Sequence, residues 1–312
     1  MNIVFELPFY NPSVGGIVET IKLAQRMNAQ VRFQRRSIYN ISIKHAYTIG
    51  MPDSTFPKCD VCITYSDNPY LGNLLKLKQI GRVMIYMLSY GMAIDRERKN
   101  IHTKGIDVLC STKKIEDAIH DENIDVNRIG FALDMDDMYD EGKERTDDLA
   151  IYYHPMPSKN YKLAVDISDA LFGSNYITGV HSFGTNEGYK SFDRPIALLS
   201  HTPNADRMQV RDIFNKCKLF INPSSSEGLN LTPIEATLCG CPSVIVDGAK
   251  DEIFIDGLTC FMSNNNFFEL YNDSIELLAY IDSYKDIFRD NMRRIVKDYT
   301  WDRLIGNINK LL

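Results

Sequence analysis

Short apolar segments alternate with helix-like patterns along this chain of 312 residues, and no other sequence feature limits its fold as strongly. A pattern with helical periodicity runs from residue 17 to residue 27, between the first two apolar segments. The apolar segments of the first half lie at 3–5, 31–33, 60–65, 82–87 and 107–110. Strands that alternate with helices form a parallel sheet with helices on both faces, so we expect a doubly wound α/β fold.

The alternation is interrupted at 134–149, a segment that is rich in charge and poor in aliphatic residues. It resumes with apolar segments at 149–153, 176–180, 195–199, 219–221 and 243–246. We therefore expect two doubly wound domains, at 1–145 and 146–295, joined by a linker. A helix at 296–312 is expected to pack back toward the first domain. Ligands of such sheets bind beyond the carboxyl ends of the strands, which places the expected site in a cleft between the domains.

Composition and cysteine usage agree with a cytoplasmic globular protein. Hydrophobic residues make up 44% and charged residues 24% of the chain, which excludes collagen-like, disulfide-scaffold and disordered classes. No apolar run approaches the roughly 20 residues of a membrane span, and the first residues, with an acid at Glu6, do not form a signal peptide. Seven cysteines, an odd number, indicate reduced thiols. Cys59 and Cys62 have the spacing of a metal pair, but no second pair has ligand spacing, so we interpret them as strand residues.

The net charge of −6 conceals two opposed halves. Residues 1–100 contain 13 lysines and arginines against 7 acids, whereas residues 101–312 contain 22 against 34. The first half therefore presents either an ordinary solvated surface or a basic face for an anionic partner. The basic residues in question include Arg32, Arg35, Arg36, Lys44, Lys76, Lys78, Arg82, Arg96, Arg98 and Lys99.

The segment 219–246 reads as strand, loop, short helix and strand. Thr232 and Glu235 have the spacing of a capping box, with Thr232 as N-cap, and Gly240 is placed to end the helix. Backbone amides at the start of such a helix form an anion site suited to a diphosphate. Glu227 and Glu235 flank this site, and because carboxylates repel phosphate they suit hydroxyl groups of a sugar and a ribose. The alternatives are a capping role for Glu235 and a solvated loop position for Glu227.

The residues Glu227-Gly228, Pro233, Glu235-Ala236, Cys239-Gly240 and Pro242 resemble the Glu-x7-Glu signature of glycosyltransferase family 4. Members of that family have the GT-B fold, in which two Rossmann-like domains face each other across a cleft. The segments 11–16, 108–112, 130–134, 248–253 and 299–302 resemble further elements of the family in the same order. The resemblance is strong over 219–262 and weak over 20–105.

The resemblance implies a retaining, metal-independent transferase that moves a sugar from a nucleotide-sugar to an acceptor hydroxyl, without a cofactor. Glu227 would hold the donor sugar, Glu235 the ribose and Lys159 the leaving diphosphate, with Glu227 and Lys159 as catalytic residues. The residues expected to bind the donor are Gly15, Gly16, His154, Ser158, Lys159, Glu227, Gly228, Leu229, Asn230, Leu231, Thr232 and Glu235. Those expected on the acceptor side are Ser89, Tyr90, Arg35 and Arg36.

Several positions depart from the family pattern. An arginine that family members place near the lysine is absent, and His154 takes its place. Asn230 stands where the family commonly has glycine, and Cys260 replaces another glycine. Asp134-Met135-Asp136-Asp137 has the form of a metal motif, but we interpret it as part of the linker. The nucleotide base is expected near the strand 196–199 and the loop 200–204.

The sequence does not identify a single acceptor. The basic first half favours an anionic acceptor, such as a lipid-linked glycan or a cell-surface polysaccharide, with peripheral contact at the inner face of a membrane. The alternatives are a transferase that glycosylates modified bases of phage DNA, a non-catalytic nucleotide-sugar-binding protein and a sugar-nucleotide epimerase.

Overall fold

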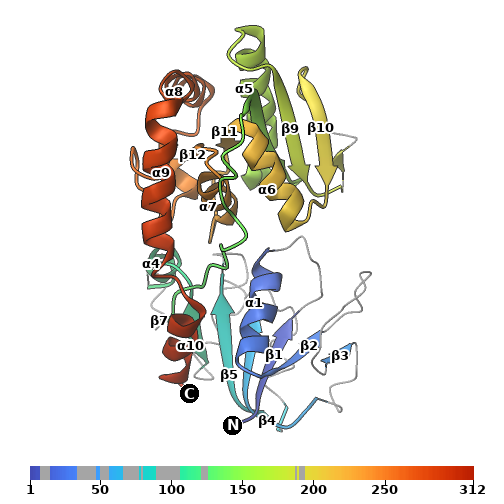
Figure 1. Ribbon diagram of the computed structural model, residues 1–312. Helices are drawn as coiled ribbons and strands as arrows, with labels where there is room; N and C mark the ends of the chain where they lie inside the picture. The colour runs from blue at the N-terminus through green and yellow to red at the C-terminus, as the bar shows by residue number, and fades with distance from the viewer. Residues whose placement is uncertain are drawn as a thin grey trace. The chain divides into compact units, whose positions relative to one another are not determined.

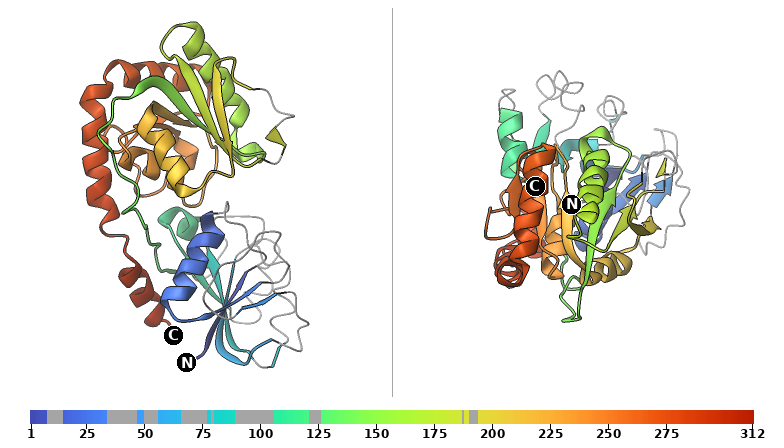
Figure 2. Two further views of the ribbon diagram at one scale, coloured as in Figure 1. Left: turned by 45° about the vertical axis from the view of Figure 1, so that its right-hand side comes forward. Right: turned by 90° about the horizontal axis from the view of Figure 1, so that it is seen from above.

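The computed structural model describes residues 1–7, 15–33, 47–49, 56–65, 77–78, 80–88, 106–120, 126–186, 188–189 and 194–312. It divides into two compact units, which are Met1–Ala132 with Tyr299–Leu312 (unit 1) and Leu133–Asp298 (unit 2). Each unit contains one parallel sheet with helices on both faces (Figures 1 and 2). The predicted α/β fold with two doubly wound sheets is therefore confirmed.

The sheet of unit 1 contains seven strands among the residues described. Its strands are β1 Ile3–Leu7, β2 Gln30–Phe33, β3 Tyr47–Ile49, β4 Cys59–Tyr65, β5 Ile80–Met87, β6 Asp107–Cys110 and β7 Val126–Arg128. The helices of this unit are α1 Gly15–Arg26, α4 Lys113–His120 and α10 Trp301–Asn309. In the strand order β3-β2-β1-β4-β5-β6-β7, the chain adds β2 and β3 on one side of β1 and β4 to β7 on the other side, as in doubly wound sheets.

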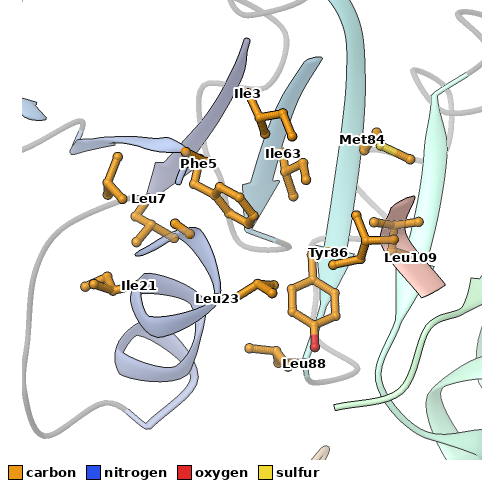
Figure 3. Close-up of a cluster of buried hydrophobic side chains, with 14 of the residues drawn as sticks. Ile3, Phe5, Leu7, Ile21, Leu23, Ile63, Met84, Tyr86, Leu88 and Leu109 are labelled. Atoms are coloured by element: carbon orange, nitrogen blue, oxygen red, sulfur yellow. The ribbon is translucent and has the colours of Figure 1, made fainter. Parts of the chain in front are cut away.

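Both faces of this sheet are buried. Phe5 and Leu7 of β1 belong to a cluster with Ile21 of α1 (Figure 3). Val4, the residue before Phe5, belongs to a second cluster with Ile115 of α4. Because helices cover both faces, most residues of these strands are apolar, and this is why the sequence reveals most of the strands.

Helix α10 is part of unit 1, although it lies at the end of the chain. Leu304 and Ile308 are buried in the core that contains β1. The Asn307 side chain donates a hydrogen bond of 3.0 Å to the Ile129 carbonyl, and the Arg26 guanidinium lies 4.3 Å from the Trp301 ring centre.

The sheet of unit 2 contains six strands among the residues described, in the order β10-β9-β8-β11-β12-β13. These are β8 Thr146–Tyr153, β9 Gly179–Gly184, β10 Leu198–Pro203, β11 Cys217–Asn222, β12 Ser243–Val246 and β13 Phe261–Ser263. Its α-helices are α5 Tyr161–Gly173, α6 Arg207–Lys216, α7 Leu231–Leu238, α8 Phe267–Ala279 and α9 Ile281–Val296. Two short 3₁₀ helices, η2 Pro157–Lys159 and η4 Asp247–Ala249, follow β8 and β12.

Unit 2 has an apolar layer on each face of its sheet. Ile151 and Tyr153 of β8 pack with residues of α5 and α8 on one face. On the other face, Phe214 of α6 meets Phe183 of β9 and Phe220 of β11 at ring-centre distances of 5.4 and 5.3 Å.

The predicted linker at 134–149 is too long, because β8 begins at Thr146. The polar start of this strand conceals it in the sequence. The Asp148 carboxylate is buried but accepts hydrogen bonds from Thr146 Oγ1 at 2.6 Å and from Thr178 Oγ1 at 2.8 Å. Strands β9 and β10 also begin later than predicted, and β3, β7 and β13 have three residues each, too few for a clear pattern.

Two residues of the expected basic face have internal partners. Arg32 is 5% exposed and donates a hydrogen bond of 2.9 Å to Glu6 Oε1. Arg82 pairs with Asp107 at 2.6 Å and donates to the Leu311 carbonyl. The prediction is therefore wrong for Arg32, and the charge of Arg82 is largely balanced. Outside the described residues lie Arg35, Arg36, Lys44, Lys76, Arg96, Arg98 and Lys99.

We predict that Ile308→Ala destabilises unit 1 by about 2–5 kcal/mol, because it removes a buried core side chain and leaves a cavity. Urea unfolding followed by the fluorescence of Trp301, the one tryptophan of the sequence, measures the change. Lys310→Ala, at the exposed C-cap of the same helix, is the control and should change stability by less than about 0.5 kcal/mol. Equal effects of the two substitutions would show that α10 does not contribute to the core.

We also predict a loss of stability of unit 2 below about pH 6.5. Burial lowers the pKa of His181, which lies 3.2 Å from Asp148 and 2.6 Å from Ser200, and burial lowers the pKa of His201 as well. The unfolded chain therefore binds protons that the folded unit excludes, so stability is present above pH 6.5 and falls as the pH decreases. His181→Gln should flatten this dependence in urea unfolding, and an NMR titration placing His181 at or above its ordinary pKa would contradict it.

Candidate functional site

The functional side chains of unit 2 lie on segments that follow strand ends. Because all its strands are parallel, β8, β10, β11 and β12 end at the same edge of the sheet (Figure 1). The segments that follow are 154–160, 204–206, 223–230 and 247–251. This edge is where a ligand of a doubly wound sheet is expected.

Lys159 and Glu227 form an ion pair at this edge. Lys159 Nζ lies 2.5 Å from Glu227 Oε1, and the side chains are 21% and 11% exposed. Lys159 ends η2, after β8, whereas Glu227 lies between β11 and α7. The pair therefore joins two segments that are 68 residues apart in the sequence.

Backbone contacts hold these two segments together. Ser225 donates hydrogen bonds to the Ser158 carbonyl from its backbone amide at 2.8 Å and from its hydroxyl at 3.3 Å. His154 Nδ1 accepts a hydrogen bond of 3.2 Å from the Met156 amide and so closes the turn before η2. A Cβ added at Gly248 would lie 2.5 Å from the Ser225 carbonyl oxygen, so the segment after β12 also packs closely here.

Helix α7 begins two residues earlier than the capping box predicts. Its N-cap is Asn230, without a side-chain capping hydrogen bond, and its first residue is Leu231. The predicted capping box of Thr232 and Glu235 is therefore wrong. The helix still starts at the predicted edge, and the first-turn amides of Leu231 and Thr232 have no acceptor within the helix. Gly240, with a φ of +75°, follows its end as predicted.

Buried polar residues fix the start of α7. The Asn230 side-chain oxygen accepts a hydrogen bond of 3.0 Å from Asn222 at the end of β11. The Asn230 amide lies 3.5 Å from Asp251 Oδ2, and Asp251 Oδ1 accepts from the Ile253 amide at 2.9 Å. The Asn230 amide is therefore occupied, and the amides of Leu231 and Thr232 are the ones that can bind a ligand.

Glu235 pairs with an arginine that the sequence analysis missed. Arg207 Nη1 lies 2.9 Å from Glu235 Oε1, and Arg207 Nε lies 2.7 Å from both carboxylate oxygens of Asp137. Arg207 Nη2 also donates to the Asp134 carbonyl. The acidic segment 134–137, which has the form of a metal motif, thus supplies partners for a guanidinium.

Tyr152 lies near Lys159 and near the carboxylates of Glu227 and Glu235. Burial, together with the negative charges of Glu227 and Glu235, raises the pKa of its phenol to about 12. Lys159 Nζ lies 6.0 Å from the centre of the Tyr152 ring. One edge of unit 2 thus combines a lysine, two carboxylates and first-turn helix amides, which together can bind a molecule that carries both hydroxyl groups and negative charge.

The structure brings together His154, Ser158, Lys159, Glu227, Gly228, Leu229, Asn230, Leu231, Thr232 and Glu235 at this edge of unit 2. Gly15 and Gly16 belong to unit 1, where they begin α1 rather than precede it. Ser89, Tyr90, Arg35 and Arg36 lie outside the described residues. The sequence analysis missed Tyr152, Arg207, Asn222 and Asp251. Tyr152 and Asn222 lie at the ends of β8 and β11, and Asp251 lies in the segment after β12, so their position relative to strand ends could have indicated these three.

The cysteines have no role at this edge. All seven are buried and free, and burial raises the pKa of Cys241 to about 12, so that its thiol stays protonated. Within the described ranges, no three histidine, cysteine or acidic side chains are grouped as metal ligands. None of the helices described combines the length and the apolar character needed to cross a membrane.

We predict that Gly248→Ala destabilises unit 2 by about 1–3 kcal/mol, because the new Cβ collides with backbone rather than with a movable side chain. Gly173→Ala, where a Cβ has no neighbour within 4 Å, is the matched control and should be neutral or stabilising. Urea unfolding followed by circular dichroism compares them. If Gly248→Ala were as stable as the control, the segments after β11 and β12 would not be in close contact.

Comparisons with known proteins agree with this geometry. Residues 187–279, which include Arg207, Glu227 and Glu235, match the family model described as glycosyl transferases group 1. An uncharacterized glycosyltransferase of Methanocaldococcus jannaschii is 22% identical over 213 residues, which are 65% of this chain and 58% of that relative. The chain thus spans less than two thirds of that relative's length.

Solved structures share the fold over the whole chain. HepE of Anabaena in complex with UDP-glucose has a TM-score of 0.81 at 13% identity, covering 99% of this chain and 98% of that chain. Sucrose-phosphate synthase of Thermosynechococcus elongatus has a TM-score of 0.77 at 10% identity, covering 100% and 98%. The chain therefore has the GT-B fold, and residues 187–279 are similar to glycosyl transferases group 1.

Proposed function

We propose that the protein is a retaining glycosyltransferase that moves a sugar from a UDP-sugar to an acceptor hydroxyl. The observation that carries the proposal is the position of Lys159, Glu227, Glu235 and the start of α7 at one edge of the unit 2 sheet. UDP is the first nucleotide to test, because HepE, which has the same fold, was crystallised with UDP and with UDP-glucose.

The diphosphate would bind to the amides of Leu231 and Thr232 and to Lys159. First-turn amides and the helix dipole favour an anion, and the lysine adds a full positive charge. Lys159 is paired with Glu227 in the free protein and would share its charge with the β-phosphate in the complex. These groups stabilise the negative charge that grows on the leaving diphosphate, so the proposal requires no metal ion.

The two carboxylates would bind hydroxyl groups of the donor. Glu227, next to Lys159, would accept hydrogen bonds from the sugar, and Glu235, in the second turn of α7, from the ribose. In the reaction, the bond between the anomeric carbon and the phosphate oxygen breaks, and the acceptor oxygen forms the new bond on the same face and passes its proton to the departing phosphate oxygen. Unit 2 would thus supply the groups that stabilise the negative charge on the leaving diphosphate.

The acceptor is proposed to be an anionic glycan, lipid-linked or at the cell surface. The excess of lysine and arginine in residues 1–100 supports this choice, but the internal pairing of Arg32 and Arg82 weakens the support. Modified bases of DNA are the second acceptor class. His154, at the position of a family arginine, favours a second function, in which the protein binds nucleotide-sugars without transferring the sugar.

We predict that Lys159→Ala lowers kcat by about 10²–10³-fold, as expected for the loss of a group that stabilises a leaving oxyanion. A thermal-shift screen against UDP-, GDP-, ADP- and dTDP-sugars first identifies the donor. Donor hydrolysis and transfer to an acceptor panel are then measured by mass spectrometry, which also reports the anomeric configuration of the product.

Lys162→Ala is the matched control for this variant. Lys162 lies one turn further along, is 58% exposed and pairs with Asp166 on the outside of α5. Unchanged activity of the Lys159 variant would contradict the proposed role of Lys159. Binding without turnover of any donor would support the second function instead.

A further inference from the structure

We propose that Arg207 is a positioning residue that holds the Glu235 carboxylate for recognition of the donor ribose. The inference rests on the proposed function, in which Glu235 accepts ribose hydroxyl groups. It adds a residue that neither the sequence motif nor the comparisons assign, and it gives a role to the contact between Arg207, after β10, and Glu235 of α7.

The contacts of Arg207 fix its guanidinium on three sides. Nη1 lies 2.9 Å from Glu235 Oε1, Nε lies 2.7 Å from the Asp137 carboxylate, and Nη2 donates to the Asp134 carbonyl. The planar, forked donor set of arginine makes several directed hydrogen bonds at once, which a lysine in this place could not. The guanidinium therefore has little freedom to turn away from Glu235.

The backbone of Arg207 is fixed as well. Arg207 is the first residue of α6, whose N-cap Asp206 forms a capping box with Gln209. The Asp206 carboxylate accepts from the Gln209 amide at 2.9 Å, and the Gln209 side chain accepts from the Asp206 amide at 2.9 Å. A reciprocal cap of this kind sets the direction in which the first helical residue extends.

A fixed guanidinium orients the carboxylate. Glu235 is 14% exposed at its side chain and Arg207 is 28% exposed, so the pair is partly shielded from water. An ionised carboxylate accepts about four hydrogen bonds. The hydrogen bond from Arg207 uses one of these positions and restricts rotation of the carboxylate. A carboxylate restricted in this way would bind ribose hydroxyls with a smaller loss of side-chain freedom.

The matched control is Arg211, one turn further along α6. Arg211 pairs with Glu141 at 3.6 Å and lies 4.9 Å from the centre of the Tyr139 ring, in the segment that follows residues 134–137. It also lies 3.8 Å from Asp212 of α6 and donates a hydrogen bond to the Tyr139 hydroxyl. Replacing it removes a comparable structural contact and leaves the pair of Arg207 with Glu235 in place.

The experiment measures binding of UDP and 2′-deoxy-UDP by calorimetry to the full chain and its variants. We expect the wild type to prefer UDP by roughly tenfold, as for the loss of a hydrogen bond to a charged group. Arg207→Met should reduce this preference to about twofold or less, and Arg207→Lys should restore it in part. Arg211→Met should keep the wild-type ratio. The ratio is insensitive to a general loss of folded protein, because both ligands require the same folded unit.

Each outcome decides one question. A wild-type ratio in Arg207→Met would overturn the positioning role and leave the proposed function intact. An equal loss of the ratio in both methionine variants would also overturn it, because the effect would then be structural. A wild type that binds neither nucleotide would contradict the proposed UDP donor itself. A wild type that binds both equally would show that the ribose 2′-hydroxyl does not contact Glu235, and the inference would fail.

Discussion

Parallel pairing of strands that are covered on both faces is the constraint on which the candidate site depends. In unit 2 it makes β8, β10, β11 and β12 end at one edge, so that residues as far apart in sequence as Tyr152 and Asp251 support the same site. The apolar layers around Tyr153 and Phe214 provide the rigid base. The loops beyond that base are free to carry polar residues, since their backbone groups are satisfied by contacts such as that of Ser225 with Ser158.

Each carboxylate of the site is paired with a cation from another strand end. Glu227 pairs with Lys159 from the segment after β8, and Glu235 pairs with Arg207 from the segment after β10. This arrangement keeps two carboxylates near the start of α7, where the negatively charged diphosphate is proposed to bind. In the free protein the cations balance the carboxylates, and in the complex Lys159 would also face the diphosphate. Tyr152, beneath them, stays neutral because burial and both carboxylates oppose its ionisation.

The fold could be predicted because its signal is distributed over many apolar strands, whereas parts of the site depend on single distant contacts. Glu227, Glu235 and Lys159 were predicted from a local motif and its resemblance, and the structure places them at one edge. The capping box failed because the helix starts at Leu231 with Asn230 as N-cap, and Glu235, beyond the first turn, pairs with Arg207, 28 residues before it. Nothing in the sequence indicated that Asp137 would bind that arginine. The polar start of β8 was interpreted as linker because Thr178, a hydrogen-bond partner of Asp148, is 30 residues away in the sequence.

A crystal structure with UDP-glucose bound tests the central claim most directly, because it locates the diphosphate. The site described here predicts a β-phosphate oxygen about 3 Å from Lys159 Nζ, another at a similar distance from the amides of Leu231 or Thr232, and ribose hydroxyls on Glu235. A nucleotide bound elsewhere on unit 2, or a diphosphate that contacts neither Lys159 nor the start of α7, would contradict it.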